Sequence, residues 1–183
     1  MRLIKYMLFL ILSGALLMSC MTGGKAPMSD IPDFYLNPPT AEDAIYGVGD
    51  ANMSSHSLSL STAKSRATND IARQVQVVVK SAITDYAQQA GAGRNDQTIT
   101  FVETISRQIV EVELQGLRTI EVATGRDGTI YVLMEYPVRE FLSDAESAFK
   151  RNEDAAFAEF KAAQALDRLN YELENNPPRA GGK

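Results

Sequence analysis

A chain of 183 residues with 45% apolar side chains is long enough to bury one hydrophobic core, and we expect one folded domain. Its formal net charge of −5 argues against nucleic acid or an anionic lipid surface as the partner, because clustered Lys and Arg bind phosphate groups. With a single cysteine the chain forms no internal disulfide, so packing must supply the stability.

The N-terminal segment has the layout of a secretory signal. Arg2 and Lys5 precede an uncharged apolar run over residues 6–17, and the only cysteine follows shortly afterwards. The run leads into a four-residue lipobox, which consists of Leu17, Met18, Ser19 and Cys20. We therefore predict cleavage after residue 19, with diacylglycerol on the Cys20 thiol and an N-acyl chain on its amine.

Two other interpretations of this segment are open. Residues 6–21 could be a retained membrane span, but they fall short of the roughly 20 apolar residues that a helix needs to cross the hydrocarbon. Cys20 could be an ordinary buried thiol, as free cysteines often are. A lone cysteine at this place in the pattern favours lipidation, and two or three acyl chains would hold the domain on its membrane. We expect no other cofactor.

Residues 20–44 are predicted to form a tether. Four of the seven prolines and two glycines lie in this segment, which excludes a regular helix or an interior strand. Such a linker would reach over tens of ångströms and lift the domain off the bilayer. Residues 31–36 are apolar enough to dock back onto the domain, and a loose aromatic segment is the alternative.

Residues 45–51 are predicted to form a short strand that contains a pair of glycines. Gly47 and Gly49 resemble part of a dinucleotide-binding loop, but Asn52 stands at the position of the third glycine and no phosphate-binding lysine follows. We therefore expect these two glycines to let a neighbouring helix approach the strand closely.

The spacing of apolar residues predicts a long core helix over residues 57–89. Ser57, Ser59 or Ser61 is expected to cap its start, and Gly91 its end. One face of the helix is apolar and the opposite side is polar, as in a helix packed on a core. The apolar positions are Ala63, Ala67, Ile71, Val75, Val78, Ala82 and Tyr86.

A second helix and a β-hairpin are predicted next. Thr98 or Thr100 can cap the helix. Its apolar face comprises Phe101, Ile105, Ile109 and Val112. Residues 117–124 and 129–136 alternate as strands around a turn-forming quartet. The second strand is apolar on both faces, which predicts an interior position covered on two sides.

From residue 138 a helical pattern continues to about residue 173, after Pro137 has ended the sheet. At about 1.5 Å per residue this helix would span some 50 Å, longer than a domain of this size usually is. Its far end must either project, as a surface for self-association or an envelope protein partner, or fold back across the domain. Pro177 and Pro178 end the helix, and residues 175–183 are expected to be disordered.

Residue types that carry catalysis or bind metals are scarce. The only histidine, His56, lies among Ser54, Ser55 and Ser57, but neighbouring residues in a loop rarely reach the geometry of a catalytic triad. No Cys or His cluster has the spacing of a zinc site, and no acidic loop has that of a calcium site. We therefore expect neither an enzyme nor a metal centre.

The order of these segments resembles the LPP20 lipoprotein family, and the first domain of the flagellar assembly protein FlgT looks similar. The resemblance covers roughly residues 31–149. Besides the lipobox, it rests on residues 31–35 ahead of Asn37-Pro38-Pro39, on Tyr46-Gly47-Val48-Gly49, on Ala63, Ala67 and Ile71-Ala72-Arg73-Gln74-Val75, and on the hairpin. It implies a β-α-α-β-β core with a flanking helix, and a location in the bacterial envelope more than any activity.

The predicted fold class is α+β, with helices packed on a sheet that contains antiparallel strands and with a long C-terminal helix. The expected organisation is a signal peptide over 1–19, a lipidated tether over 20–44, a domain over 45–149, a helical extension over 150–174 and a tail over 175–183.

Two functions fit this organisation. The first is a lipid-anchored structural, assembly or protein-interaction module of the cell envelope. The second is binding of a small ligand or cell-wall fragment in a groove between the long helix and the hairpin, near Tyr46, Tyr86 and Tyr131. In a host with two membranes we expect the outer one, because Met21 stands where aspartate commonly signals retention in the inner membrane.

Overall fold

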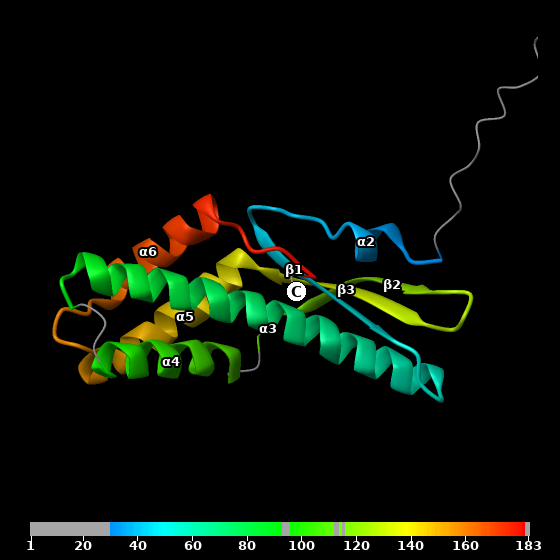
Figure 1. The fold of residues 1–183 in the computed structure, drawn as a ribbon, viewed down its shortest axis with the longest axis horizontal. Helices are drawn as coiled ribbons and strands as arrows, with labels where there is room; N and C mark the ends of the chain where they lie inside the picture. The colour runs from blue at the N-terminus through cyan, green and yellow to red at the C-terminus, as the bar shows by residue number, and fades with distance from the viewer. Residues whose placement is uncertain (1–29, 93–95, 112–113, 115, 182–183) are drawn as a thin grey trace, which may run out of the picture.

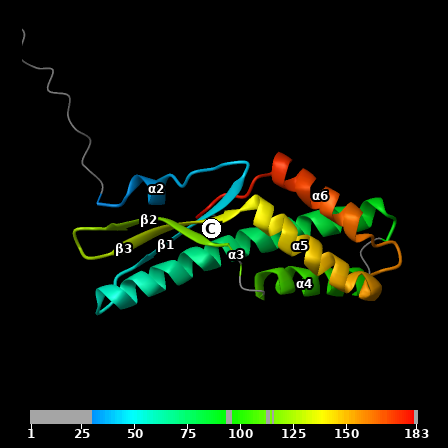
Figure 2. The ribbon, with the colours of Figure 1, turned by 180° about the vertical axis from the view of Figure 1, so that it is seen from behind.

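The structure is a computed structural model that describes residues 30–92, 96–111, 114 and 116–181 (Figure 1). A long helix runs along a small sheet at one end and among three further helices at the other (Figures 1 and 2). The elements in chain order are α2 (Asp33–Leu36), β1 (Ala44–Ala51), α3 (His56–Gln89), α4 (Asp96–Glu111), β2 (Arg118–Thr124), β3 (Ile130–Pro137), α5 (Val138–Asn152), η1 (Glu153–Ala155) and α6 (Ala162–Asn175). The predicted α+β class is confirmed.

The sheet has the strand order β1-β3-β2, and both pairings are antiparallel. The central strand β3 is buried along most of its length, as the apolar character of both its faces predicted. Its even-numbered residues join the main core with α3, whereas Tyr131 and Leu133 pack on the opposite face with Phe34. The sheet therefore has an inner face against α3 and an outer face that the N-terminal segment covers.

The first half of α3 lies directly on β1, and the two strand glycines make this contact possible. A Cβ atom added to Gly49 would lie 2.2 Å from the carbonyl oxygen of Ala63, and one added to Gly47 would lie 2.5 Å from that of Ala67. Real side chains do not approach a backbone so closely. The prediction that these glycines serve close packing, rather than nucleotide binding, agrees with this geometry.

The prediction for the N-cap of α3 is wrong, and the prediction for its C-terminal end is correct. The N-cap is Ser55, whose side chain accepts a hydrogen bond from Leu58 N–H, and not one of the three serines expected. At the other end Gly91 has φ +79°. Its N–H donates to Gln88 O, and Ala92 N–H donates to Ala87 O, which is the glycine-dependent termination that the sequence predicted.

The second helix begins earlier than expected. Thr98 and Thr100 lie inside α4, which already includes Asp96, so neither threonine caps it. Phe101, Ile105 and Ile109 are buried on its inner face, as predicted, while Val112 lies outside the described residues. The two strands of the hairpin are confirmed as β2 and β3.

The prediction of one continuous C-terminal helix is wrong. The chain leaves α5 at Asn152, passes through η1 and returns as α6, which packs against α3 and α5. The reversal buries Phe157 and Phe160, which are 3% and 2% exposed. Because burying two aromatic side chains outweighs the helical propensity of this proline-free and glycine-free stretch, the far end folds back rather than projecting.

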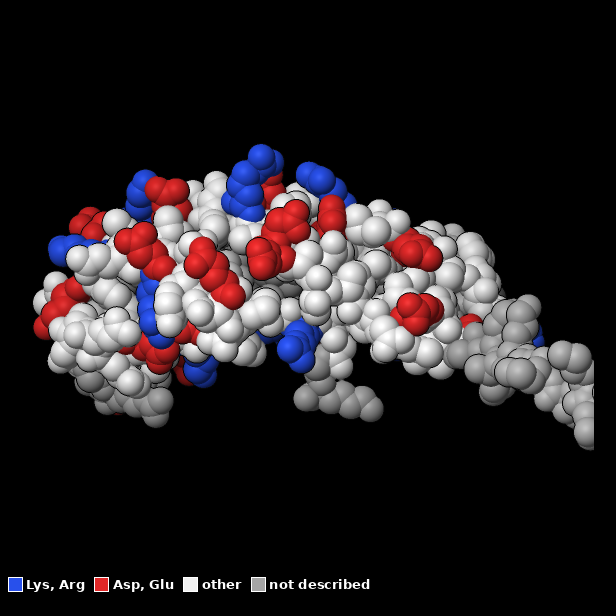
Figure 3. All heavy atoms as spheres, turned by 90° about the horizontal axis from the view of Figure 1, so that it is seen from above, with Lys and Arg blue, Asp and Glu red and all other residues white. Residues whose placement is uncertain are grey.

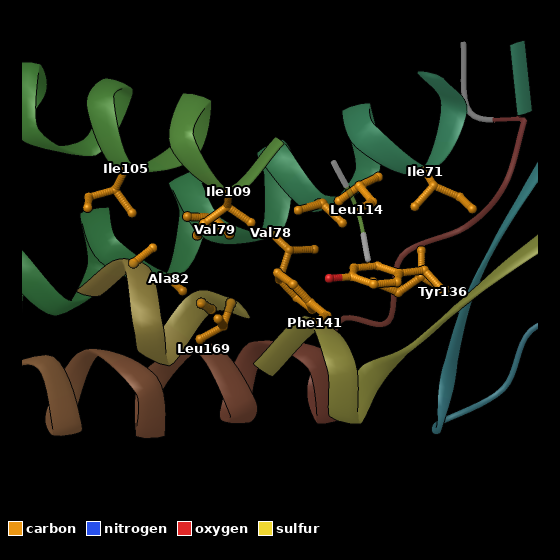
Figure 4. Close-up of a cluster of buried hydrophobic side chains, with 14 of the residues drawn as sticks. Ile71, Val78, Val79, Ala82, Ile105, Ile109, Leu114, Tyr136, Phe141 and Leu169 are labelled. Atoms are coloured by element: carbon orange, nitrogen blue, oxygen red, sulfur yellow. The ribbon is translucent and has the colours of Figure 1, made fainter. Parts of the chain in front are cut away.

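The main core fills the space between α3, α4, α5, α6 and β3 (Figure 4). Side chains from all five elements meet there, among them Val79, Ile109, Tyr136, Phe141 and Leu169 (Figure 4). The helical extension expected over residues 150–174 is therefore part of the same core as the sheet.

The N-terminal and C-terminal segments both pack against the domain. Phe34 of α2 is 9% exposed and lies on the outer face of the sheet, so residues 31–36 dock as one of the two alternatives proposed. The described part of the tail ends beside the sheet, where Gly181 N–H donates to Asp70 Oδ2 at 2.9 Å. This contact contradicts the expectation that the tail is disordered throughout.

Candidate functional site

The two edges of the sheet differ in how the chain covers them, and they are the candidate functional surfaces. Three polar side chains of α3, spaced four residues apart, satisfy backbone groups on the free edge of β1. The contacts are Arg66 Nη1 to Asp50 O (2.7 Å), Val48 N–H to Asp70 Oδ2 (3.2 Å) and Gln74 Nε2 to Tyr46 O (2.8 Å). This edge is therefore occupied from within the chain.

Asp70 of α3 makes the central contact with the β1 edge. Its side chain is 3% exposed, and it accepts hydrogen bonds from Val48 N–H, from Gly181 N–H and from Arg73 Nη2 at 3.2 Å. Gln74 Nε2 also donates to Asp70 Oδ2, at 3.4 Å. These four donors compensate for the cost of burying a carboxylate. A single carboxylate thus holds an edge strand, a helix and the C-terminal tail together.

An open cleft of about 600 Å³ lies beside this carboxylate. Its walls carry the guanidinium groups of Arg66 and Arg73 and the carboxylates of Asp50 and Asp70, with Gly181 at its rim. Donors and acceptors at close spacing suit polypeptide backbone groups, and the N–H of Gly181 occupies one of the acceptors there.

Tyr35 connects the N-terminal segment to the same edge. Its hydroxyl donates to Asp50 Oδ1 at 2.7 Å, and its ring meets that of Tyr131 edge to face at 5.0 Å between centroids. Burial, followed by the hydrogen bond and the negative charge of Asp50, raises the pKa of Tyr35 to about 12.

This pKa predicts an alkaline weakening of the docked segment. The folded state retains the Tyr35 proton to a higher pH than the unfolded chain, whose tyrosines titrate near 10. The resulting stabilisation is present below pH 10 and is lost as pH rises from 10 to about 12. In Tyr35→Phe, the tyrosinate absorbance step near pH 12 should disappear and stability should lose this pH dependence. A step that persists in Tyr35→Phe but disappears in Tyr171→Phe would contradict the assignment.

The opposite edge is different. Among the described residues, β2 pairs only with β3, and six of its seven residues are exposed. Ile120 and Val122 are 49% and 44% exposed, although both are β-branched residues that usually pack against a neighbour. A bulge between Thr119 and Glu121 interrupts the register here. The β2 edge therefore presents apolar side chains beside a backbone that no described segment pairs.

The structure does not bring the three candidate tyrosines into one groove. Tyr46 and Tyr131 pack with the outer-face cluster, whereas Tyr86 belongs to the main core. The Tyr86 hydroxyl donates to Glu159 O at 2.8 Å and accepts from Lys161 N–H at 3.0 Å, so it fixes the chain reversal before α6. Because Tyr86 contacts the chain reversal and belongs to a different cluster from Tyr46 and Tyr131, the three residues do not line one groove.

Two serines near His56 have a structural role. Ser55 caps α3, and buried Ser59 accepts from Met53 N–H at 2.9 Å and donates to Ser55 O. Over the described residues, no group of three His, Cys, Asp or Glu side chains could hold a metal ion. The lipobox residues Leu17, Met18, Ser19 and Cys20 lie outside that part of the chain.

Charge and hydropathy add two observations. On the face drawn in Figure 3, acidic and basic side chains are interspersed over the helical half, and acidic side chains predominate towards the end with the hairpin. Within the described residues, no helix combines the length and the apolar character needed to span a bilayer.

We did not predict from the sequence that side chains of α3 bind the backbone of the β1 edge, although the amino-acid pattern of α3 indicates it. Arg66, Asp70 and Gln74 repeat every four residues immediately beside the buried stripe of α3. Polar residues that repeat every four positions beside an apolar stripe indicate side chains that reach the border of the surface on which the helix packs. Here that border is an edge strand.

The comparisons with known proteins agree with this fold. The family model described as LPP20 lipoprotein matches residues 32–136, a range that contains all of α2, β1, α3, α4 and β2 and all of β3 except its last residue. Neither the curated protein sequences nor the solved structures gave a significant match.

Proposed function

The chain belongs to the LPP20 lipoprotein family, and from this we propose that it is an envelope lipoprotein that is anchored through acylated Cys20 and binds a protein partner. The anchor follows from the lipobox. A cleaved chain that begins with a diacylated or triacylated cysteine carries enough buried methylene groups for stable membrane attachment. We further propose the outer membrane as its location, since Met21 follows the cysteine.

The observation that supports a protein partner is the contrast between the sheet edges. The β1 edge has backbone groups bound by α3 side chains, whereas β2 presents exposed Ile120 and Val122. Natural sheets usually protect such edges, so an uncovered one is suited to accept a strand from another chain. We propose that the partner adds its strand to β2.

The proposed anchor predicts that lipidation depends entirely on the sulfur atom of Cys20. In cells fed labelled palmitate, the wild-type chain should be labelled and should partition with membranes, because the thiol is the attachment point for the lipid. Cys20→Ala should take up no label and should leave the membrane fraction. Ser19→Ala keeps a small residue before the cysteine and serves as the matched control. Unchanged labelling of Cys20→Ala would remove the proposal.

The β2 surface predicts position-dependent crosslinking. A photoreactive residue at Val122 should give an adduct in intact cells several-fold more often than one at Val77, which is exposed on α3 away from the edge. An adduct of twice the chain's own mass would identify a second copy as the partner, and another mass a different protein. Equal yields at the two positions would argue against the β2 edge as the binding surface.

A further inference from the structure

One end of the molecule carries exposed apolar side chains that do not belong to the β2 edge. Met53 and Leu58 lie in the connection from β1 to α3 and in the first turn of α3, and they are 43% and 47% exposed. The backbone between them is held in place. Met53 N–H donates to Ser59 Oγ at 2.9 Å, and Leu58 N–H donates to Ser55 Oγ at 3.2 Å. Their outward direction is thus set by a hydrogen-bonded turn.

The N-terminal segment enters the described structure at this same end. Asp30, the first described residue, forms an ion pair at 3.0 Å with Arg126 in the hairpin turn. The hairpin turn is tied in turn to the β1–α3 connection, because Asn52 Nδ2 donates to Asp127 O at 3.1 Å. Three segments therefore meet in one tip, which consists of residues 30–31, 52–58 and 125–128, and both ribbon views place them together (Figures 1 and 2).

The length of chain outside the structure limits where the tip can be. Nine residues lie between Cys20 and Asp30, and the ten steps from one Cα atom to the next reach at most about 36 Å in a fully extended chain. The expected tether over residues 20–44 is much shorter than its sequence suggested, because residues 31–43 already lie on the domain or lead directly into β1. The helix α3 alone spans about 50 Å, so its far end lies well away from the tip.

We propose that this tip rests on the bilayer, with Met53 and Leu58 in the lipid headgroup region, and that the α4–α6 end points away from the membrane. The inference relies on the acylation of Cys20 proposed above. It also assigns different roles to two exposed apolar surfaces, since Ile120 and Val122 stay available to a protein while the tip contacts lipid.

The charges of the tip indicate which lipids it suits. Arg126 is paired with Asp30. Hydrogen bonds from the backbone N–H and the hydroxyl of Thr129 lower the pKa of Asp127, so this carboxylate stays ionised. Arg126 is the only lysine or arginine among the residues of the tip, so contact depends on apolar insertion rather than on anionic headgroups.

The absence of tryptophan from the sequence permits a direct test. The full-length acylated variants Met53→Trp and Gln88→Trp are reconstituted in vesicles of phosphatidylcholine with brominated acyl chains. Gln88 is exposed in the last turn of α3, at the opposite end of that helix, and provides the matched control. We expect strong quenching and a blue-shifted emission for Met53→Trp, and an emission for Gln88→Trp equal to that in water. Leu58→Trp should behave like Met53→Trp.

The outcomes separate this inference from the function proposed above. Flotation of the protein with the vesicles, together with quenching only at the tip, supports both. Flotation with equal and unquenched emission from all three variants overturns the membrane contact of the tip and leaves the anchor standing. If the acylated protein does not float, the anchor itself is wrong and the tip inference falls with it. Quenching that needs anionic lipid would overturn the apolar mode of contact.

Discussion

Gly49→Ala should destabilise the fold by about 3 kcal/mol, near the upper end of what overpacking costs. The added Cβ would lie 2.2 Å from Ala63 O and 2.5 Å from Ala67 N. Both atoms belong to the backbone of α3, so no side-chain rotation can relieve the contact. The helix must move away from β1, and the polar contacts of Arg66, Asp70 and Gln74 with the strand edge would lengthen with it.

Urea unfolding followed by circular dichroism measures this effect as a shift of the midpoint. Val48→Ala is the matched control, because Val48 is the preceding residue on β1 and points to the outer face, where its truncation leaves the helix contact intact. We expect it to cost less than half as much. If Gly49→Ala unfolds at the same urea concentration as the wild type, α3 does not lie on β1 as closely as described.

Phe160→Ala should cost about 3–5 kcal/mol, which is the usual range for removing a fully buried aromatic side chain. Phe160 is 2% exposed, and its ring lies within 6.1 Å, centroid to centroid, of four other rings. These rings belong to Tyr86, Phe101, Phe149 and Phe157. The side chain thus joins α3, α4, α5 and the reversal, and its loss should free α6 first.

Hydrogen exchange tests the order of events. In Phe160→Ala the amides of α6 should lose protection before those of β3, because the cavity opens beside the chain reversal and not beside the sheet. Val77→Ala removes an apolar side chain that is 68% exposed and should change stability by no more than about 0.5 kcal/mol. Uniform loss of protection along the chain in Phe160→Ala would contradict a separately weakened α6.

Local patterns identified most of the elements. The strand that contains Gly47 and Gly49, the long helix and the hairpin were each predicted to within a residue, because the spacing of apolar side chains and the position of turn residues act over a few residues. The helix caps were predicted less well. Ser55, and not a later serine, caps α3, since several serines compete and only the path of the preceding loop selects among them.

The chain reversal shows where local patterns fail. Residues 150–174 contain no proline or glycine, and their apolar spacing is compatible with a continuing helix. Whether Phe157 and Phe160 extend that helix or turn into a core depends on the rings of Tyr86 and Phe101, which lie far away in sequence. The same limit applies to the three tyrosines, because the groove predicted from their residue type is replaced in the structure by packing in two separate clusters.

The sequence by itself predicted the building blocks, which are an α+β set of elements and strand glycines without a nucleotide loop. It also contains the lipobox from which cleavage before Cys20 and its lipidation are predicted. Those properties follow from residue type and from neighbours along the chain. Only the tertiary structure decided that α6 folds back, that Asp70 joins the β1 edge to the tail, and that no described segment pairs with the outer edge of β2. Each of these depends on contacts between segments distant in sequence, which local spacing does not encode.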